Sequence, residues 1–384
     1  MPPPGGSCRS APKEAVAPPS RPPPPDDERM PVEPSMRAST LVPVPEERLH
    51  QLVEAMRGQP VLMLVDLVVD RFISGTPKRI SREAPVLILR YAGESLAPGG
   101  GANAVANVMA LGGRPYPLGL VGDDDSGRDL LAALASREIP TAAILVRPGY
   151  RTPTKTRILA GFPTGIKQQV VRLDREQEVV LSAEEVAALR AAIVHVGTAR
   201  AAILSDYGYG CVAPDLLPEV RKAVGTDGAI IVDSRFRLGD FAGLDGATPN
   251  EEEAETLLGR PLDDARGDDT RAGRELRELL RARILLITRG SRGMSLFTRD
   301  GAAHLPVHGT DQVADVTGAG DTVIGTFALA LGAGGSALEA MILANYAGGV
   351  VVMKMGTATA SAAELHAAIA ADPRPRLEMT WAAF

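Results

Sequence analysis

Short runs of consecutive apolar residues alternate along this chain with longer segments that carry apolar residues at helical spacing. One run occupies residues 61–65, and further runs occupy 116–121, 201–205, 229–232 and 284–288. Runs of this length without polar alternation are typical of strands buried on both faces. The alternation of such strands with helices predicts an α/β fold, namely a doubly wound, mostly parallel sheet with helices on both faces.

Polar residues stand at or just past the ends of several predicted strands. They are Asp66, Asp206, Asp233, Asn250 and Thr288. In open α/β sheets the ligands bind at the carboxyl ends of the strands. The sequence therefore predicts that these side chains share one site.

Two segments, 74–90 and 151–174, interrupt this alternation with a period of two. They predict small antiparallel strands outside the main sheet, either as a β-lid over the site or as ordinary surface hairpins. The lid is favoured because the second segment is rich in groups that bind anions and hydroxyls: Lys155, Arg157, Gln168, Gln169 and Arg172. A substrate with a phosphate at its far end needs such cations.

The two ends of the chain have a different character. Twelve of the first 40 residues are proline, so residues 1–45 predict a disordered, proline-rich tail that is either passive or used for docking. The folded domain is expected over 46–372, beginning with a short amphipathic helix, and residues 373–384 are expected to form a second tail.

Composition limits the classes of function. The chain has 384 residues and a net charge of -6, which gives no support for a nucleic-acid partner. No stretch has the length and apolarity of a membrane span. Cys8 and Cys211 cannot form a disulfide framework, so a cytoplasmic location is expected.

The segment Ala314–Thr322 carries the most specific chemistry in the chain. Gly318, Ala319 and Gly320 precede a long apolar helix, where the first backbone N–H groups have no intrahelical partner and the helix dipole favours an anion. Asp321 places a carboxylate at the edge of this cradle. Such a carboxylate suits the removal of a proton from a hydroxyl that attacks phosphorus, although it also suits a helix cap.

Several motifs together resemble those of one enzyme family, the ribokinase-like (PfkB) carbohydrate kinases, over roughly residues 58–370. The segments are 79–86, 98–107, 204–210, 248–253, 288–295, 315–322 and 349–359. Within that family they resemble the branch that phosphorylates D-glycero-D-manno-heptose 7-phosphate at O1 on the route to ADP-heptose. The resemblance implies an ATP-dependent sugar kinase that uses Mg²⁺, and a β-lid that pairs two copies of the chain into a homodimer.

The resemblance also implies roles for individual residues. Asp321 is expected to be the catalytic base, and the amides of Gly318, Ala319 and Gly320 to form the anion hole. The residues expected to bind the sugar phosphate are Asp66, Gly100, Gly101, Asn103, Lys155, Arg157 and Arg172. The residues expected to line the nucleotide are Asp233, Asn250, Thr288, Arg289, Gly290, Gly293 and Asn345.

Asn250 and Glu253 have a second interpretation. The resemblance implies that they order Mg²⁺ through water, whereas their spacing at a helix start also predicts a capping box. Asp315 and Thr317 are implied ligands of a monovalent cation.

Four residues depart from the expected patterns. Val65 stands where the family has glycine, Tyr209 where the related heptose kinases have lysine, and Ser234-Arg235 where they have Pro-Lys. The loss of a lysine leaves open another sugar or sugar phosphate as substrate, such as ribose or a fructose phosphate. The bifunctional relatives continue into a nucleotidyltransferase domain, and this sequence has no His-x-Gly-His element that would indicate one.

Two other classes of protein remain as alternatives. Gly208-Tyr-Gly210-Cys-Val-Ala213 imitates a dinucleotide fingerprint, but it lies in mid-chain instead of opening the fold. A non-catalytic sugar-binding descendant of a kinase would fit the lost lysine but not the retained Asp321. The chain has no Walker A motif, which excludes a P-loop kinase.

Overall fold

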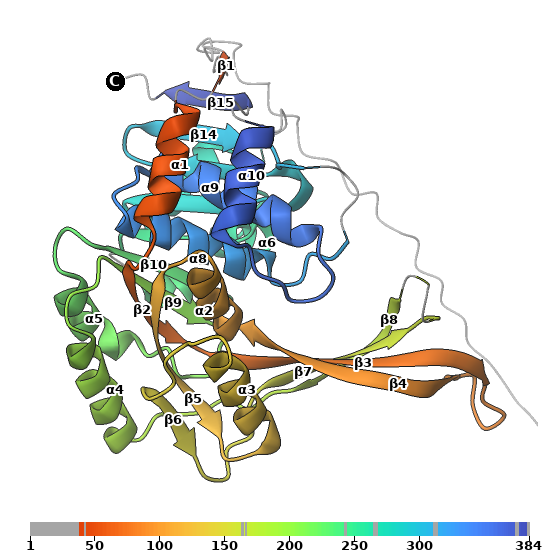
Figure 1. The fold of residues 1–384 in the computed structure, drawn as a ribbon. Coiled ribbons are helices and arrows are strands. Elements are labelled where there is room, and N and C mark those ends of the chain that lie inside the picture. The colour runs from red at the N-terminus through yellow and green to blue at the C-terminus, as the bar shows by residue number, and fades with distance from the viewer. Residues whose placement is uncertain are drawn as a thin grey trace, which may run out of the picture. The chain divides into compact units, whose positions relative to one another are not determined.

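The predicted strands form one large sheet in the computed structural model of the chain (Figure 1). The structure describes residues 38–41, 44–162, 165, 167–241, 244–263, 268–309, 314–372 and 376–381. Within them the sheet has eleven strands in the order β1-β15-β14-β13-β12-β11-β10-β9-β2-β5-β6. The parallel strands are β2 (Pro60–Val65), β5 (Arg114–Gly122), β6 (Ile144–Arg147), β9 (Ala201–Asp206), β10 (Ala229–Ser234), β11 (Gly246–Ala247) and β12 (Ile284–Thr288).

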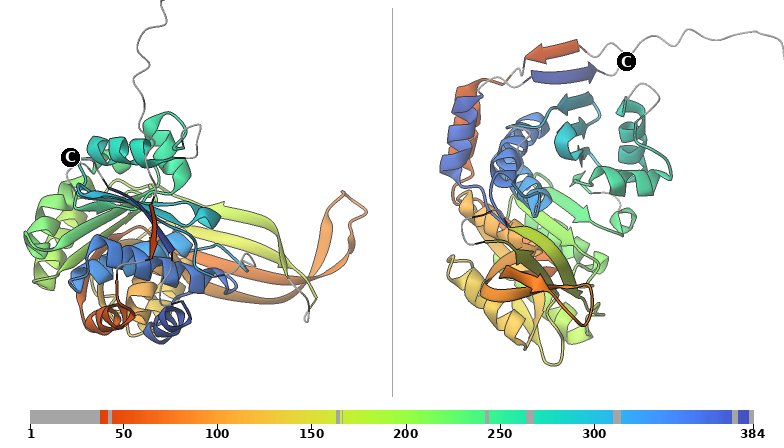
Figure 2. Two further views of the ribbon diagram at one scale, coloured as in Figure 1. Left: turned by 90° about the horizontal axis from the view of Figure 1, so that it is seen from above. Right: turned by 90° about the vertical axis from the view of Figure 1, so that its right-hand side faces the viewer.

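Helices cover both faces of this sheet, as the apolar pattern predicts (Figures 1 and 2). Alternate residues of β2 explain the two layers, because Met63 and Val65 join one hydrophobic core whereas Leu62 and Leu64 join the other. The first core packs against α1 (Glu46–Ala55), α2 (Gly101–Ala110), α3 (Asp125–Ala135), α8 (Ala319–Gly332), α9 (Ala337–Val352) and α10 (Ala362–Ala371). The second packs against α4 (Ala183–Val196), α5 (Leu217–Val224), α6 (Glu251–Leu258) and α7 (Thr270–Leu279).

A separate sheet of four strands projects from the main one (Figures 1 and 2). Its strands are β4 (Leu87–Gly100), β3 (Leu67–Ile80), β7 (Thr154–Ala160) and β8 (Gln168–Arg175), in that order. The strands predicted outside the main sheet are thus confirmed and are longer than expected. The central pair β3–β7 is parallel, however, and not antiparallel. We call this sheet the lid.

Antiparallel strands extend the far edge of the main sheet. They are β13 (Met294–Phe297), β14 (Gly301–Leu305), β15 (Arg376–Trp381) and β1 (Ala38–Leu41). β1 and β15 lie within the two segments that the sequence predicts to be tails, so the backbone differs from that prediction over these residues. The exposed edge of β14 supplies the N–H and C=O groups with which β15 pairs. Val44 and Pro45, directly before α1, are also described, and the rest of both predicted tails lies outside the described residues.

Within the described part of the chain, no helix has the length and apolarity needed to cross a membrane.

Candidate active site

Asp321 lies in the first turn of α8 and is buried. The helix begins where Gly318 adopts a left-handed conformation with φ of 80°. The Asp321 carboxylate accepts two hydrogen bonds: Tyr207 donates its hydroxyl to Oδ1 at 2.7 Å, and Asn103 donates its Nδ2 to Oδ2 at 3.1 Å. The glycine turn thus brings α8 against α2 and the loop after β9, so the carboxylate is held by groups from two other parts of the chain.

The electrostatic surroundings make Asp321 a suitable base near neutral pH. Burial raises the pKa of its carboxyl to about 7, against the opposing effect of the hydrogen bonds from Tyr207 and Asn103. The Asp70 carboxylate raises this pKa further, and the Lys155 ammonium lowers it. A general base works best when its pKa lies near the operating pH.

The start of α8 has open backbone amides, but the predicted amide of Ala319 is not one of them. The amide of Ala319 donates to the carbonyl of Val316, whereas within the described residues the amides of Gly320 and Asp321 have no recorded protein acceptor. A Cβ added to Gly320 would meet nothing within 4 Å. The space before this turn is therefore open to an anion.

Asn103 is fixed by its helix neighbour. Asn107 donates its Nδ2 to Asn103 Oδ1 at 3.2 Å, and its own Oδ1 accepts the amide of Ala360 at 3.2 Å. Asn103 in turn donates Nδ2 to the carbonyl of Gly318 at 3.2 Å as well as to Asp321. The predicted sugar ligand Asn103 therefore lies directly against the predicted base, and the i, i+4 spacing accounts for its orientation.

Asp66 has a different environment from the one expected of a sugar ligand. Its buried carboxylate accepts the backbone amides of Tyr207 and Tyr209 at 2.9 Å and of Cys211 at 3.1 Å. Burial raises the pKa of Asp66 to about 6 in spite of these bonds. Asp66 thus holds the loop after β9, and sugar binding by this residue stays a prediction without a geometric basis.

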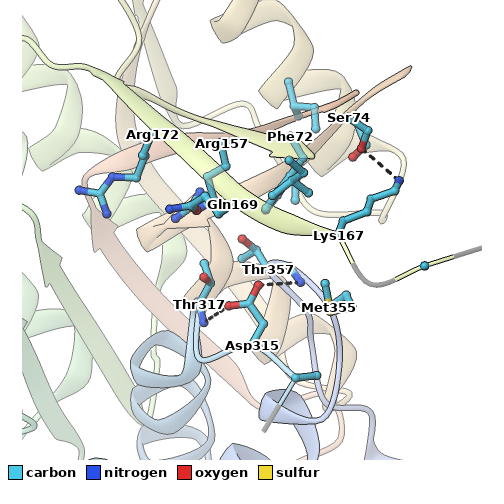
Figure 3. A pocket seen from close by; sticks show the side chains of 17 residues that line it. Phe72, Ser74, Arg157, Lys167, Gln169, Arg172, Asp315, Thr317, Met355 and Thr357 are labelled. Carbon is cyan, nitrogen blue, oxygen red and sulfur yellow. Dashed lines mark hydrogen bonds between the residues drawn. The ribbon is translucent and has the colours of Figure 1, made fainter. Parts of the chain in front are cut away.

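A cavity of about 1050 Å³ lies beneath the lid (Figure 3). On the lid side it is lined by Phe72, Arg157 and Gln169, and on the opposite side by Asp315 and Thr357, which face them. The other side chains that line it and are drawn in Figure 3 include Ser74, Lys167, Arg172, Thr317 and Met355. Its lining is rich in cations and hydroxyls, which suits a phosphorylated polyol.

Asp70, and not Asp66, is the carboxylate bound to two residues that line this cavity, Arg157 and Thr357. The Arg157 guanidinium forms a buried ion pair with Asp70 Oδ1, and Thr357 donates its hydroxyl to Asp70 Oδ2 at 2.6 Å. Gly99 leaves room for this side chain, since a Cβ there would lie 2.5 Å from Asp70 Oδ2. The sequence signal that could have selected Asp70 is its spacing of four residues from Asp66.

The cationic side chains of the lid differ in their burial and in their partners within the protein. Arg157 is buried with Asp70, whereas Arg172 is half exposed and pairs with Asp174 on its own strand at 2.9 Å. Lys167 donates to the Ser74 hydroxyl at 3.1 Å. Lys155 Nζ lies 5.1 Å from the centroid of the Tyr207 ring. The pKa of Lys155 is lowered, first by burial and to a smaller extent by the nearby Arg235 guanidinium. Arg172 and Lys167 are thus the cations most accessible from the cavity.

Gly100 and Gly101 form the start of α2, and both positions exclude larger residues. Gly100 has φ of 51°, and a Cβ there would lie 2.8 Å from Val68 Cγ2. A Cβ on Gly101 would lie 2.6 Å from the Val65 Cβ. Val65, the residue that replaces the family's glycine, is therefore accommodated because Gly101 has no side chain.

The residues predicted to line the nucleotide fall into two groups. Asp233, at the end of β10, has a pKa raised well above its usual value by burial and by the carboxylates of Glu253 and Asp321. Asn250 and Glu253 form the capping box of α6, with reciprocal hydrogen bonds of 2.9 Å, so the capping interpretation is confirmed. Thr288 at the end of β12 forms a parallel bridge with Asn250. These residues share the strand edge next to Asp321.

The remaining predicted nucleotide residues have contacts within the protein. The buried guanidinium of Arg289 pairs with Asp269 at 2.8 Å and with Asp263 at 2.5 Å, so its side chain anchors the segment before α7. Asn345 donates to the carbonyl of Pro306 at 2.9 Å. Gly290 and Gly293 have positive φ, and a Cβ on Gly293 would lie 2.0 Å from the Leu305 carbonyl oxygen. Nucleotide binding by these residues stays a prediction.

The comparisons with known proteins fit this geometry. The family model for pfkB family carbohydrate kinases matches residues 61–364.

The chain belongs to the pfkB family of carbohydrate kinases.

Relatives of known name extend this result. The chain is 40% identical over 317 residues to "Bifunctional protein HldE" of Gluconacetobacter diazotrophicus, a match that covers 81% of this chain and 64% of that protein. It is 38% identical to the protein of the same name from Mesorhizobium japonicum, with coverage of 85% and 65%. The chain thus spans about 65% of the length of the curated relatives that it matches.

Solved structures confirm the fold. Phosphofructokinase-2 from Escherichia coli in complex with substrates and products aligns with a TM-score of 0.66 at 19% identity, over 82% of this chain and 99% of that one. Arabidopsis thaliana ribokinase complexed with ribose and ATP aligns with a TM-score of 0.63 at 19% identity, over 81% and 99%. The ribokinase-like α/β fold predicted from the sequence is confirmed. The alternative interpretation of residues 208–213 as a dinucleotide-binding fingerprint is not confirmed.

The pfkB site has carboxylates suited to a cation bound with the nucleotide. Asp233 and Glu253 are each raised in pKa by burial, and Glu253 adds to the effect on Asp233, so a nearby divalent cation would relieve their repulsion. Among the described residues, no cluster of three or more metal-binding side chains exists. This arrangement fits Mg²⁺, which keeps several waters and takes most of its other ligands from phosphates.

Proposed function

We propose that this pfkB kinase transfers the γ-phosphoryl group of ATP to O1 of D-glycero-D-manno-heptose 7-phosphate, which yields the 1,7-bisphosphate on the route to ADP-heptose. The observation that carries the proposal is the position of Asp321. This buried carboxylate lies at an open helix N-terminus, near enough to Asp70 and Lys155 of the lid for their charges to affect its pKa. The similarity to the HldE proteins over most of the chain supports the choice of substrate.

In the proposed reaction, Asp321 accepts the proton from the attacking hydroxyl as that oxygen bonds to the γ-phosphorus. The bond between this phosphorus and the bridging oxygen breaks, and ADP leaves. The amides of Gly318, Gly320 and Asp321 neutralise charge on the transferring group, whereas that of Ala319 stays bonded to the Val316 carbonyl. Bound Mg²⁺, ordered through water by Asn250 and Glu253, would neutralise the phosphates of ATP, and Asp315 and Thr317 would hold a monovalent cation.

The cation-lined side of the lid supplies the proposed contact with the 7-phosphate. Arg172 and Lys167 reach the cavity from β8 and the preceding turn. The buried pair of Arg157 and Asp70 would instead face the sugar hydroxyls. We place the reaction in the cytoplasm, in keeping with the free, buried Cys211.

Tyr209 favours one alternative, a different sugar or sugar phosphate as acceptor. This residue replaces the lysine of the related kinases, and its hydroxyl donates to Glu176 at 2.7 Å. The position therefore offers no cation to a phosphate. A comparison of heptose 7-phosphate, fructose phosphates and ribose as phosphoryl acceptors with ATP tests the proposed function directly. Turnover confined to an acceptor other than heptose 7-phosphate would refute the heptose assignment.

Arg172→Ala is expected to raise KM for heptose 7-phosphate by roughly tenfold or more while leaving KM for ATP nearly unchanged, because a charge-assisted hydrogen bond of about 1.5–3 kcal/mol is lost. Arg175→Ala is the matched control, since Arg175 is an exposed arginine on the same strand and does not line the cavity. Steady-state kinetics with each substrate varied in turn make the measurement. Equal effects of Arg172→Ala on both substrates would remove this residue from the sugar site.

We also propose that two copies of the chain pair through their lids. β8 is an edge strand of the lid, and it exposes Val170, Val171 and Leu173. A row of exposed apolar side chains beside an open strand edge favours pairing with a second sheet.

Leu173→Glu is expected to convert the dimer to a monomer in sedimentation or light-scattering measurements, because it places a charge in the proposed apolar contact. Val180→Glu, at a residue exposed by 91% beyond the lid, should leave the dimer intact. A wild-type protein that is monomeric at micromolar concentration would contradict the lid dimer.

A further inference from the structure

Tyr207 is held at both ends in the loop after β9. Its backbone amide donates to Asp66 Oδ2 at 2.9 Å, and its side-chain hydroxyl donates to Asp321 Oδ1 at 2.7 Å. The ring is half-buried, with Lys155 Nζ 5.1 Å from its centroid, and a Cβ on Gly100 would lie only 3.2 Å from Tyr207 Cε2. The phenol therefore has little freedom to leave the carboxylate.

The carboxylate of Asp66 fixes the loop that carries Tyr207. It accepts two more backbone amides of the same loop, those of Tyr209 and Cys211. A neutral side chain in this position could not accept three such bonds as strongly. Asp66 thus influences Asp321 indirectly, by fixing the loop that carries Tyr207.

The two oxygens of Asp321 are held to different degrees. Tyr207 donates to Oδ1 at 2.7 Å, whereas Asn103 donates to Oδ2 at 3.1 Å. Asn103 Nδ2 also donates to the Gly318 carbonyl, so it keeps a partner when it gives up Asp321. Oδ2 is therefore the oxygen that an incoming hydroxyl can take over.

We propose that Tyr207 is a positioning residue for the phosphoryl transfer, whose hydroxyl holds Asp321 by Oδ1 and so presents Oδ2 to the sugar hydroxyl. This inference rests on the proposed function. The proton passes from the sugar hydroxyl to Oδ2 as the new oxygen–phosphorus bond forms and the bond to ADP breaks. Tyr207 keeps its own proton throughout, because burial and the Asp321 carboxylate raise its pKa well above the usual value.

The charges around Asp321 set the direction of the expected effect. Asp70 on β3 and Asp233 on β10 disfavour the ionised carboxylate, and Lys155 on β7 favours it. The donated bonds from Tyr207 and Asn103 also favour the ionised form. Removal of the Tyr207 hydroxyl should therefore shift the titration of Asp321 to higher pH.

The test compares Tyr207→Phe with Tyr209→Phe. The control removes the same hydroxyl from the same loop, but that hydroxyl donates to Glu176 instead of Asp321. The carboxyl titration of Asp321 is followed by ¹³C NMR on aspartate-labelled protein, with the signal assigned by its loss in Asp321→Asn. The acidic limb of the kcat profile is measured on the same samples.

We expect Tyr207→Phe to move both the titration and the acidic limb upward by about one pH unit, so that kcat below the limb falls by about tenfold. Tyr209→Phe should move neither. An unmoved titration in folded Tyr207→Phe would overturn the proposal. If that variant fails to fold, 3-fluorotyrosine is placed at position 207, because it is a stronger donor of similar size. A downward shift of the Asp321 titration would then support the role of Tyr207, and no shift would overturn it. A wild-type protein that phosphorylates no sugar would instead refute the proposed function, and this role with it.

Discussion

Asp321→Asn is expected to lower kcat by roughly 10²–10⁴-fold, the usual loss when a general base is removed. Asparagine keeps the shape of the side chain but cannot accept the proton from the sugar hydroxyl. Binding of ATP should persist, because the amides at the start of α8 belong to the backbone. Steady-state kinetics and calorimetric titration with ATP on the same purified variant make the measurement.

The control for this variant is Asp227→Asn, which changes an exposed aspartate in the turn before β10. It should leave both kcat and ATP affinity unchanged. Near-normal turnover of Asp321→Asn would contradict the proposed base and return Asp321 to the role of a helix-start residue.

The same variant has a predictable effect on stability. The folded protein raises the pKa of Asp321 to about 7 from 3.8. The stability associated with this group is thus fully present below pH 4 and is lost as the pH rises through 7. Asp321→Asn cannot ionise, so it should gain stability relative to the wild-type protein on going from pH 5 to pH 8.

A second large effect is expected from alanine substitutions in the glycine turn. Gly318→Ala should lower both stability and kcat, because φ of 80° is strained for alanine and its Cβ would lie 2.4 Å from Asn103 Nδ2. The strain costs about 1–3 kcal/mol. The displaced Asn103 should then disturb Asp321.

Gly320→Ala, in the same turn, is expected to raise stability but to lower activity. This residue is exposed within α8, and its Cβ would meet nothing within 4 Å, so the folded protein should gain about 0.8–1 kcal/mol from helix propensity. The added methyl group nevertheless stands where the phosphoryl group is proposed to bind. We therefore expect a loss of at least tenfold in kcat/KM for ATP, of the order seen when a preorganised donor is blocked. Melting curves and ATP kinetics check both variants, and normal kinetics of Gly320→Ala would move the phosphate away from this turn.

Periodicity predicted the parts of the fold in which local pattern and burial agree. The apolar runs of β2 and β12 and the capping box of α6 occur where the sequence places them. The strands β13 and β14 were not indicated, because Met294–Phe297 is a short segment and Gly301–Leu305 has no clear alternation. Their pairing is set by contacts between strands and not by local propensity.

The site was predictable as a set of motifs but not as a set of contacts. The glycine turn and Asp321 occupy the geometry that their spacing implies. That Asp66 would hold a loop, whereas Asp70 would contact residues that line the cavity, was not predictable, since each follows an apolar residue. Only the folded loop after β9 shows that Asp66 accepts three backbone amides. The contacts of Arg289 were not predictable either, because its three carboxylate neighbours are distant in sequence.

β2 of the main sheet leads almost directly into β3 of the lid. In this connection, Asp66 is the only residue between Val65, which ends β2, and Leu67, which begins β3, and it also anchors the loop that holds Asp321. A substrate that shifts the lid would therefore also act on Asp66 and on the loop that holds Asp321. The rate of proton removal would then be sensitive to groups far along the sugar.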